Sequence, residues 1–100
     1  MSAPERELKL SKRARRDFQH ILAYTELNWG ERQVFVYRDL IDEALEAIRR
    51  KPGIGHTHDA LPDTHRVYSV GSHVVVYRER GDVIEVSRIV HKRMSLAQHV

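Results

Sequence analysis

Apolar residues recur at intervals of three and four through the first half of the chain, which is the pattern of amphipathic helices. The first such stretch covers residues 14–29 and follows Ser11, a residue type that caps helix N-termini. The second covers residues 31–50 and follows Gly30, which suits the end of the first helix. We expect two long helices folded as an antiparallel hairpin, followed by a loop over residues 51–64.

The second half changes to the period of two that is typical of strands. Two-residue links that begin with glycine, Gly71-Ser72 and Gly81-Asp82, suit tight hairpin turns. The expected strands cover residues 65–70, 73–78 and 83–90, with an N-terminal strand at residues 6–10. The order is therefore β-α-α-β-β-β with a short C-terminal helix or tail. This is an α+β fold in which a helical hairpin packs on a small antiparallel sheet.

Both faces of the expected sheet carry apolar residues, although two helices can cover only one face. Even-length turns place on one face Tyr68, Val70, Val75, Tyr77, Ile84, Val86 and Val90, interrupted by Arg66, His73 and Arg88. The opposite face carries Val67, Val74, Val76, Val83 and Ile89 beside polar residues. Because exposed apolar area usually marks an interface, we expect something outside this chain to cover the second face or a sheet edge.

Composition limits the class of protein. With 100 residues, 41% hydrophobic and 31% charged, the chain fits one globular domain over residues 1–100. The absence of cysteine excludes disulfide scaffolds, thiolate metal sites and cysteine nucleophiles. Short apolar runs and a polar N-terminus favour a cytoplasmic protein without membrane contact. A net charge of +3 permits binding to nucleic acid or to an acidic protein but requires neither.

Few residues suggest covalent chemistry. His56, His58 and Asp59 could hold a metal ion, but solvated loop histidines explain the same spacing, and we expect neither a metal nor a cofactor. No serine lies in a nucleophile-elbow motif, and no glycine-rich loop has the phosphate-binding pattern.

A general acid–base ribonuclease site is the stronger possibility. Such a site needs a cation for the phosphate, a base and an acid. Arg66, Arg88 and His91 on neighbouring strands could supply the cation and the acid, and Glu46 could be the base. The competing interpretation is that these residues are ordinary surface charges.

The order and spacing of several motifs along nearly the whole chain resemble the ParE toxins of the ParE/RelE superfamily. The residues that carry this resemblance are Leu10-Ser11 with Ala14 and Asp17, Tyr24-Thr25, Trp29-Gly30-Glu31, the hairpin from Val70-Gly71 to Tyr77-Arg78, Arg88 to His91, and Arg93-Met94.

The resemblance implies the toxin of a type II toxin–antitoxin system, which inhibits DNA gyrase by binding and not by catalysis, with the gyrase A protein as the expected point of contact. A ParD-like antitoxin would neutralise it in a hetero-oligomer and would alone contact operator DNA, through a ribbon-helix-helix dimer. RelE-like relatives on the same fold cut messenger RNA on the ribosome, so a ribonuclease remains an alternative. A binding module without toxicity is another alternative function.

Two sets of residues are expected to contact partners. The residues expected to bind the target are Trp29, Arg32, Arg88, His91, Lys92 and Arg93, chosen for charge and exposure. The residues expected to bind the antitoxin are Val67, Val74, Val76, Arg78 and Ile89, chosen as an apolar surface with an arginine at its rim. Trp29 could instead cap the core at the end of its helix.

Overall fold

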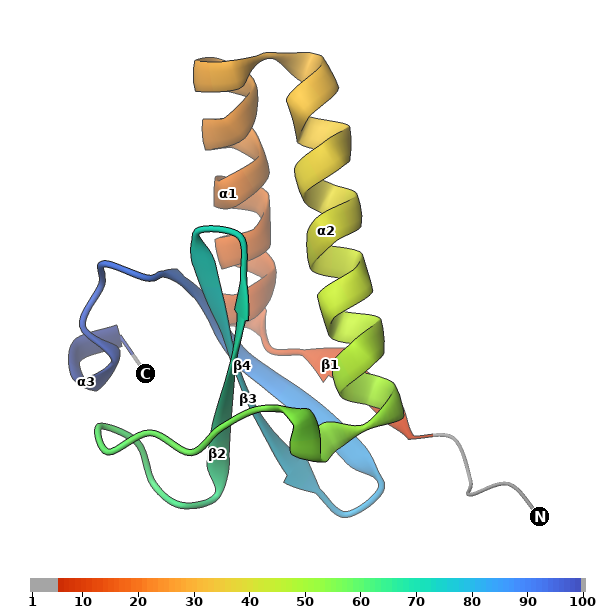
Figure 1. Ribbon diagram of the computed structural model, residues 1–100, viewed down its shortest axis with the longest axis vertical. Helices are drawn as coiled ribbons and strands as arrows, with labels where there is room; N and C mark the ends of the chain where they lie inside the picture. The colour runs from red at the N-terminus through yellow and green to blue at the C-terminus, as the bar shows by residue number, and fades with distance from the viewer. Residues whose placement is uncertain (1–5, 100) are drawn as a thin grey trace.

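A computed structural model describes residues 6–99 and shows the expected α+β architecture, a helical hairpin packed on one face of a sheet (Figure 1). Its elements are β1 (Glu7–Leu10), α1 (Lys12–Trp29), α2 (Glu31–Arg50), the 3₁₀ turn η1 (Pro52–Ile54), β2 (His65–Val70), β3 (His73–Arg80), β4 (Val83–His91) and α3 (Leu96–His99).

Local signals fix the ends of the helices as expected. The Ser11 hydroxyl accepts a hydrogen bond from the backbone N–H of Ala14 at 3.0 Å, so Ser11 is the N-cap of α1. Gly30 has φ of 90° and joins α1 directly to α2, a conformation that residues with a Cβ rarely adopt. Within residues 6–99, no helix combines the length and the apolarity that crossing a membrane requires.

The sheet has the strand order β1-β4-β3-β2. Strands β2, β3 and β4 form the expected antiparallel meander, whereas β1 pairs parallel to β4, so the expectation of a wholly antiparallel sheet is wrong at this edge. Gly71 and Gly81 have φ of 55° and 60° at the first turn positions, and no other residue type has positive φ in the described part of the chain. This agrees with type II′ turns.

A β-bulge changes which residues of β4 face the helices. Val76 pairs with Arg88 and the next residue, Tyr77, pairs with Val86, so Ser87 is an extra residue in β4. Beyond Ser87, the side chains of β4 point to the opposite faces from those that strict alternation gives. Ile89 therefore joins the core beneath the helices, and Arg88 turns to the opposite face. Val90, which pairs with Val74, also lies on the opposite face. Strict alternation predicted the reverse for Arg88, Ile89 and Val90, and this prediction is wrong.

The main core lies between the hairpin and the sheet. Its buried members are Ala14, Ile21, Ile41, Ala44, Leu45, Ile48, Val70, Val75, Tyr77, Ile84, Val86 and Ile89. The second face is also partly covered by the chain itself. Val76 and Val90 on that face are 0% and 2% exposed. Residues of the loop after η1 and of the C-terminal segment line one cavity with Val67 and Val74, so both segments lie against this face.

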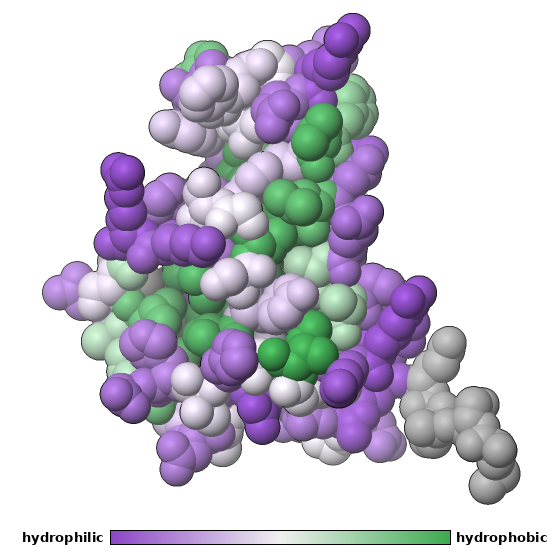
Figure 2. All heavy atoms as spheres, in the orientation of Figure 1, coloured by the Kyte–Doolittle hydropathy of each residue, from purple (hydrophilic) through white to green (hydrophobic). Residues whose placement is uncertain are grey.

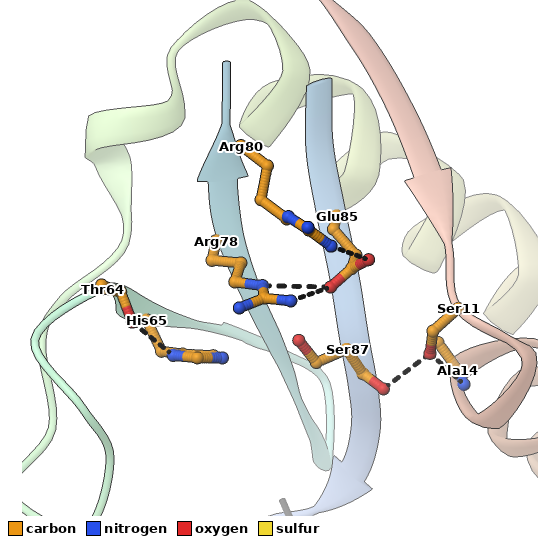
Figure 3. A network of polar contacts seen from close by, with 8 residues as sticks. All are labelled: Ser11, Ala14, Thr64, His65, Arg78, Arg80, Glu85 and Ser87. Atoms are coloured by element: carbon orange, nitrogen blue, oxygen red, sulfur yellow. Dashed lines mark hydrogen bonds and ion pairs between the residues drawn. The ribbon is translucent and has the colours of Figure 1, made fainter. Parts of the chain in front are cut away.

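That covering corrects the expectation of an open apolar face. Val76 is 0% and Ile89 is 2% exposed, so neither reaches the surface where a partner could contact it. Val67 and Val74 are half-buried and remain accessible from a cavity. The Arg78 guanidinium forms an ion pair with Glu85 at 3.0 Å, and Arg80 approaches the same carboxylate (Figure 3).

Candidate functional site

The helical hairpin projects beyond the sheet (Figure 1). The part of α2 that lies on the sheet buries Ile41 and Ile48 completely. Near the turn between the helices, the exposed fractions of Tyr24, Leu27 and Trp29 are 65%, 87% and 73%. The interpretation of Trp29 as a cap on the core is therefore wrong. Among the residues that the structure describes, the most exposed large apolar side chains lie on the projecting part of the hairpin.

A groove of about 540 Å³ lies where the hairpin leaves the sheet, and Figure 2 shows the outline of the molecule hollowed beside the projecting helices. It is formed by α1, α2, the turn between β2 and β3, and the end of β4. The lining residues are Tyr24, Thr25, Trp29, Gln33, Tyr37, Ser72, His73 and His91. Concave surfaces of this size that combine aromatic walls with a few polar groups are typical binding sites.

Tyr37 and His73 form the fixed wall of the groove. The Tyr37 hydroxyl accepts a hydrogen bond from the backbone N–H of Ser72 at 3.1 Å and is bonded to Nδ1 of His73. This approach requires glycine at position 71, because a Cβ there would lie 2.8 Å from the Tyr37 hydroxyl oxygen. We assign the hydroxyl proton to the bond with His73, which leaves the imidazole proton on Nε2.

Burial keeps this wall uncharged. It lowers the pKa of His73, and the nearby His91 lowers it further. Burial also raises the pKa of the Tyr37 hydroxyl, although its bond to Ser72 opposes the shift. The two imidazole rings stand edge to face with centroids 5.2 Å apart. Nδ1 of His91 accepts the backbone N–H of Arg93 at 3.1 Å, so neutral His91 also carries its proton on Nε2.

A second cavity of about 420 Å³ lies between the loop after η1 and the C-terminal segment, over the second face of the sheet. Its lining residues are His58, Ala60, Val67, Ser69, Val74, His91, Lys92, Met94, Ser95 and Leu96. The backbone N–H of Lys92 donates to the Ser72 carbonyl at 2.9 Å, which ties the C-terminal segment to the β2–β3 turn. His91 lines both cavities.

Arg88 is held by Asp17. Its Nε and Nη2 donate to the two carboxylate oxygens at 2.7 and 3.0 Å, and the Ile89 N–H donates to the same carboxylate at 2.9 Å. This hydrogen bonding raises the pKa of Arg88 despite partial burial. The side chains of Arg88 and Asp17 are only 13% and 14% exposed. Arg88 therefore fastens α1 to β4, and the expectation that it offers a free cation to the target or to RNA is wrong.

The residues of the expected ribonuclease site are not brought together. Strand β3 lies between β2, which carries Arg66, and β4, which carries Arg88, so the expectation of neighbouring strands is wrong. Arg66 donates to the Gly55 carbonyl at 3.0 Å. Glu46 lies on α2 with Arg49 and Arg50, and its hydrogen bond to Arg49 contributes most to lowering its pKa to about 2. Among these four residues, His91 alone lines the groove.

The loop histidines have local partners. The backbone of His56 pairs with Val67, and Nδ1 of His58 accepts the Ala60 N–H at 3.0 Å. Among the side chains that the structure describes, no three His, Asp or Glu residues are grouped closely enough to hold a metal ion.

The sequence reasoning located part of the groove. Trp29 and His91 line it, Lys92 lines the adjoining cavity, and Arg32 and Arg93 are exposed nearby in sequence. It missed Tyr24, Tyr37 and His73 as lining residues. The length of the two helices could have indicated these residues, because helices of this length extend past a sheet of short strands and leave part of their surface uncovered by it.

Comparison with known proteins identifies relatives over almost the entire chain. The family model described as the ParE toxin of the type II toxin–antitoxin system parDE matches residues 8–96. The chain is 35% identical over 92 residues to Toxin ParE1 of Caulobacter vibrioides, covering 92% of this chain and 95% of the relative. It is 30% identical to Toxin ParE1 of Mycobacterium tuberculosis, with 91% and 94% covered.

Solved structures agree on the fold. A chain of the chromosomal ParDE toxin–antitoxin system from P. aeruginosa superposes with a TM-score of 0.76 at 17% identity, covering 87% of this chain and 96% of that one. A chain of the RelBE2 toxin–antitoxin complex from Mycobacterium tuberculosis gives a TM-score of 0.62 at 14% identity, with 89% and 100% covered. On the family match and the sequence identity, this chain belongs to the ParE toxins of type II toxin–antitoxin systems.

Proposed function

We propose that this ParE toxin acts by binding DNA gyrase and blocking replication, without covalent chemistry of its own, and that a ParD-like antitoxin neutralises it. The observation that carries the proposal is the groove beneath the projecting hairpin, where aromatic side chains are exposed and burial lowers the pKa of the His73 imidazole. Such a surface can recognise a protein by apolar burial and hydrogen bonding.

The positions of the candidate acid–base residues favour binding over RNA cleavage. Hydrolysis of RNA requires a cation, an acid and a base within reach of one phosphate. Arg88 is engaged by Asp17, Arg66 by the Gly55 carbonyl, and Glu46 by arginines of its own helix. Each of these side chains would have to break its present hydrogen bonds before all three could act on the same RNA phosphate.

The cations best placed to contact gyrase lie outside the groove. Arg32 is exposed at the start of α2, and Arg93 is exposed in the segment after β4. Exposed charges at an interface rim contribute mainly to association rate and specificity. We expect the double charge reversal of Arg32 and Arg93 to weaken gyrase inhibition and to leave antitoxin binding intact. Reversal of Arg15, which is exposed on α1, is the matched control.

The decisive experiment compares two activities in parallel. Purified protein is added to gyrase with relaxed plasmid, and separately to translating ribosomes with a defined messenger RNA. The proposal expects loss of supercoiling at toxin concentrations comparable to that of gyrase, intact messenger RNA, and restoration of supercoiling by the co-encoded antitoxin. Messenger RNA cleavage with turnover, and unaffected supercoiling, would instead establish the RelE-like alternative. Absence of both activities together with normal growth on induction would leave a binding module without toxicity.

A further inference from the structure

The exposed side of the first half of α1 carries four cations within five consecutive positions, namely Lys12, Arg13, Arg15 and Arg16. We call these four side chains the α1 basic face. Ala14, the fifth residue, is buried and packs into the core on the opposite side of the helix. The whole chain has a net charge of +3, so the four charges of the basic face exceed it and the rest of the chain is slightly acidic. Positive charge is therefore distributed unevenly, as in many proteins that bind nucleic acids.

Contacts within the protein do not account for the α1 basic face. Within residues 6–99, no side-chain hydrogen bond or ion pair involves any of its four members. The carboxylate that follows them, Asp17, is bound to Arg88 and to the Ile89 N–H. The first turn of α1 has no acidic residue, and cations at the start of a helix oppose its dipole. Folding therefore gains little from these cations.

We propose that the α1 basic face binds the phosphate backbone of double-stranded DNA without reading its sequence. The toxin itself then contacts DNA, in addition to any contact that its antitoxin makes. The surface is separate from both cavities, because none of its residues lines either of them. It is also separate from Arg32 and Arg93, the cations assigned above to gyrase. The inference thus goes beyond the proposed function and does not depend on it.

The type and the spacing of the cations suit a phosphate backbone. Three of the four are arginines, whose planar guanidinium groups donate paired hydrogen bonds to phosphate oxygens. From Lys12 to Arg16 the helix rises about 6 Å, at about 1.5 Å per residue. Duplex DNA carries about one negative charge per 1.7 Å of its axis, so it can meet several of these cations at once. Such contacts release the counterions condensed on the duplex, and this release favours binding.

The surroundings of the α1 basic face favour a duplex over a protein or a single strand. Protein interfaces usually depend on aromatic or apolar anchors, and single strands bind by stacking their bases on aromatic rings. In residues 6–99 the large exposed apolar side chains begin at Tyr24, about two helical turns beyond Arg16. The basic face itself offers charge and hydrogen-bond donors, which are the groups that contact phosphates.

The first experiment measures binding of the purified full chain to a fluorescein-labelled DNA duplex by fluorescence anisotropy. The logarithm of the association constant should fall with the logarithm of the salt concentration with a slope of about −3.6, since each of four phosphate contacts contributes about −0.9. A duplex of equal length and unrelated sequence should give the same dissociation constant within about twofold. A clear preference for one sequence would contradict backbone recognition.

Matched double substitutions locate the DNA-binding surface. Arg13→Gln with Arg16→Gln should raise the dissociation constant about fivefold or more at low salt and make the slope less steep by about 2. Arg38→Gln with Lys51→Gln removes the same net charge from exposed positions and should change the dissociation constant less than about twofold. The first variant should be no less stable than the wild type to urea, because it removes cations that oppose the dipole of α1.

A second ligand tests the preference for a duplex. Single-stranded RNA of equal length should bind more weakly than the DNA duplex, because its lower charge density releases fewer counterions. Tighter binding to the RNA would overturn the inference. Equal weakening by the two double variants would also overturn it, since net charge and not the α1 basic face would then determine binding. So would absence of DNA binding by the wild type at low salt.

The supercoiling assay separates this inference from the proposed function. The Arg13→Gln, Arg16→Gln variant should inhibit gyrase as the wild type does, because the cations assigned to gyrase lie elsewhere. Loss of inhibition in this folded variant would assign the α1 basic face to gyrase and overturn the inference. Gyrase inhibition by a wild-type toxin that does not bind DNA would overturn the inference alone. DNA binding through this face without gyrase inhibition would support the inference and contradict the proposed function.

Discussion

The two halves of the helical hairpin have the same helical periodicity but different environments. The half that lies on the sheet buries Ile21 of α1 and Ile41 and Ile48 of α2 against strands. The half near the turn continues the same helices past the end of the sheet and exposes Tyr24 and Trp29. One half stabilises the fold, and the other offers surface to a partner.

This difference shows that an amphipathic helix does not by itself reveal what its apolar face will contact. A helix of 18 residues is about 27 Å long at 1.5 Å per residue. Apolar residues of the helices are buried where the helices lie on the sheet, and they line an open groove beyond its end. Substitutions in the two halves should therefore separate effects on stability from effects on binding.

The largest expected effect is on the packed half. Ile48→Ala should lower the free energy of unfolding by about 2–5 kcal/mol, because Ile48 is 0% exposed and its removal leaves a cavity between α2 and the sheet. Urea denaturation followed by circular dichroism measures this change. A loss below about 1 kcal/mol would show that the packed half contributes less than its burial indicates.

The next effect tests the attachment of α1 to β4. Asp17→Ala should cost about 2–4 kcal/mol, because it removes the acceptor of Arg88 and of the Ile89 N–H in a largely shielded position. A double-mutant cycle with Arg88→Met isolates the pair. Asp39→Ala, which removes a 67% exposed carboxylate, should have little effect. Additive losses in the cycle would contradict the direct coupling of Asp17 to Arg88.

A smaller effect concerns pH and the wall of the groove. Burial lowers the pKa of His73 from 6.5, so between the two pKa values the unfolded chain binds more protons than the folded one. The free energy of unfolding should therefore be fully retained above about pH 6.5 and fall as the pH drops below it. His65, whose pKa burial also lowers, contributes in the same direction.

His73→Gln should reduce this pH dependence, measured by urea denaturation between pH 5 and pH 8. His65→Gln should remove a separate part of the pH dependence of the free energy of unfolding. His20→Gln, at an exposed histidine of α1, is the control for loss of an imidazole. An unchanged slope in His73→Gln would show that the wall of the groove is not held neutral by burial.

The smallest effect on stability is expected in the projecting half. Trp29→Ala and Leu27→Ala should each leave the free energy of unfolding within about 0.5 kcal/mol, because both side chains are largely exposed. A large loss of stability in thermal or urea unfolding would remove the distinction between the two halves.

Most of the fold follows from local sequence signals. Ser11 and Gly30 set the ends of α1, and the two glycine-first turns set the hairpins of the meander. The bulge at Ser87 was not predictable, because nothing in the local sequence distinguishes it from the neighbouring strand residues. In the structure the Ser11 hydroxyl donates to the Ser87 carbonyl at 2.9 Å, a contact between distant parts of the chain (Figure 3).

The candidate site was predictable only in part. Trp29, His91 and Lys92 stood out by residue type and position. Trp29 and His91 line the groove, and Lys92 lines the adjoining cavity. Arg88 stood out for the same reason, but its guanidinium is bound to Asp17, 71 positions away. Whether a charge is free or paired depends on tertiary neighbours, and residue type alone does not reveal them.

The helices, the turns and the membership in the ParE family can be read from the sequence, because they depend on local conformational preferences and on the order of motifs. Which apolar residues lie in the core, which cations are paired and where the groove opens depend on the folded molecule. Burial and electrostatic pairing are set by distances between parts of the chain that are far apart in sequence. The end of the sheet, a feature of the assembled molecule, sets the boundary between the packed and the projecting parts of the hairpin.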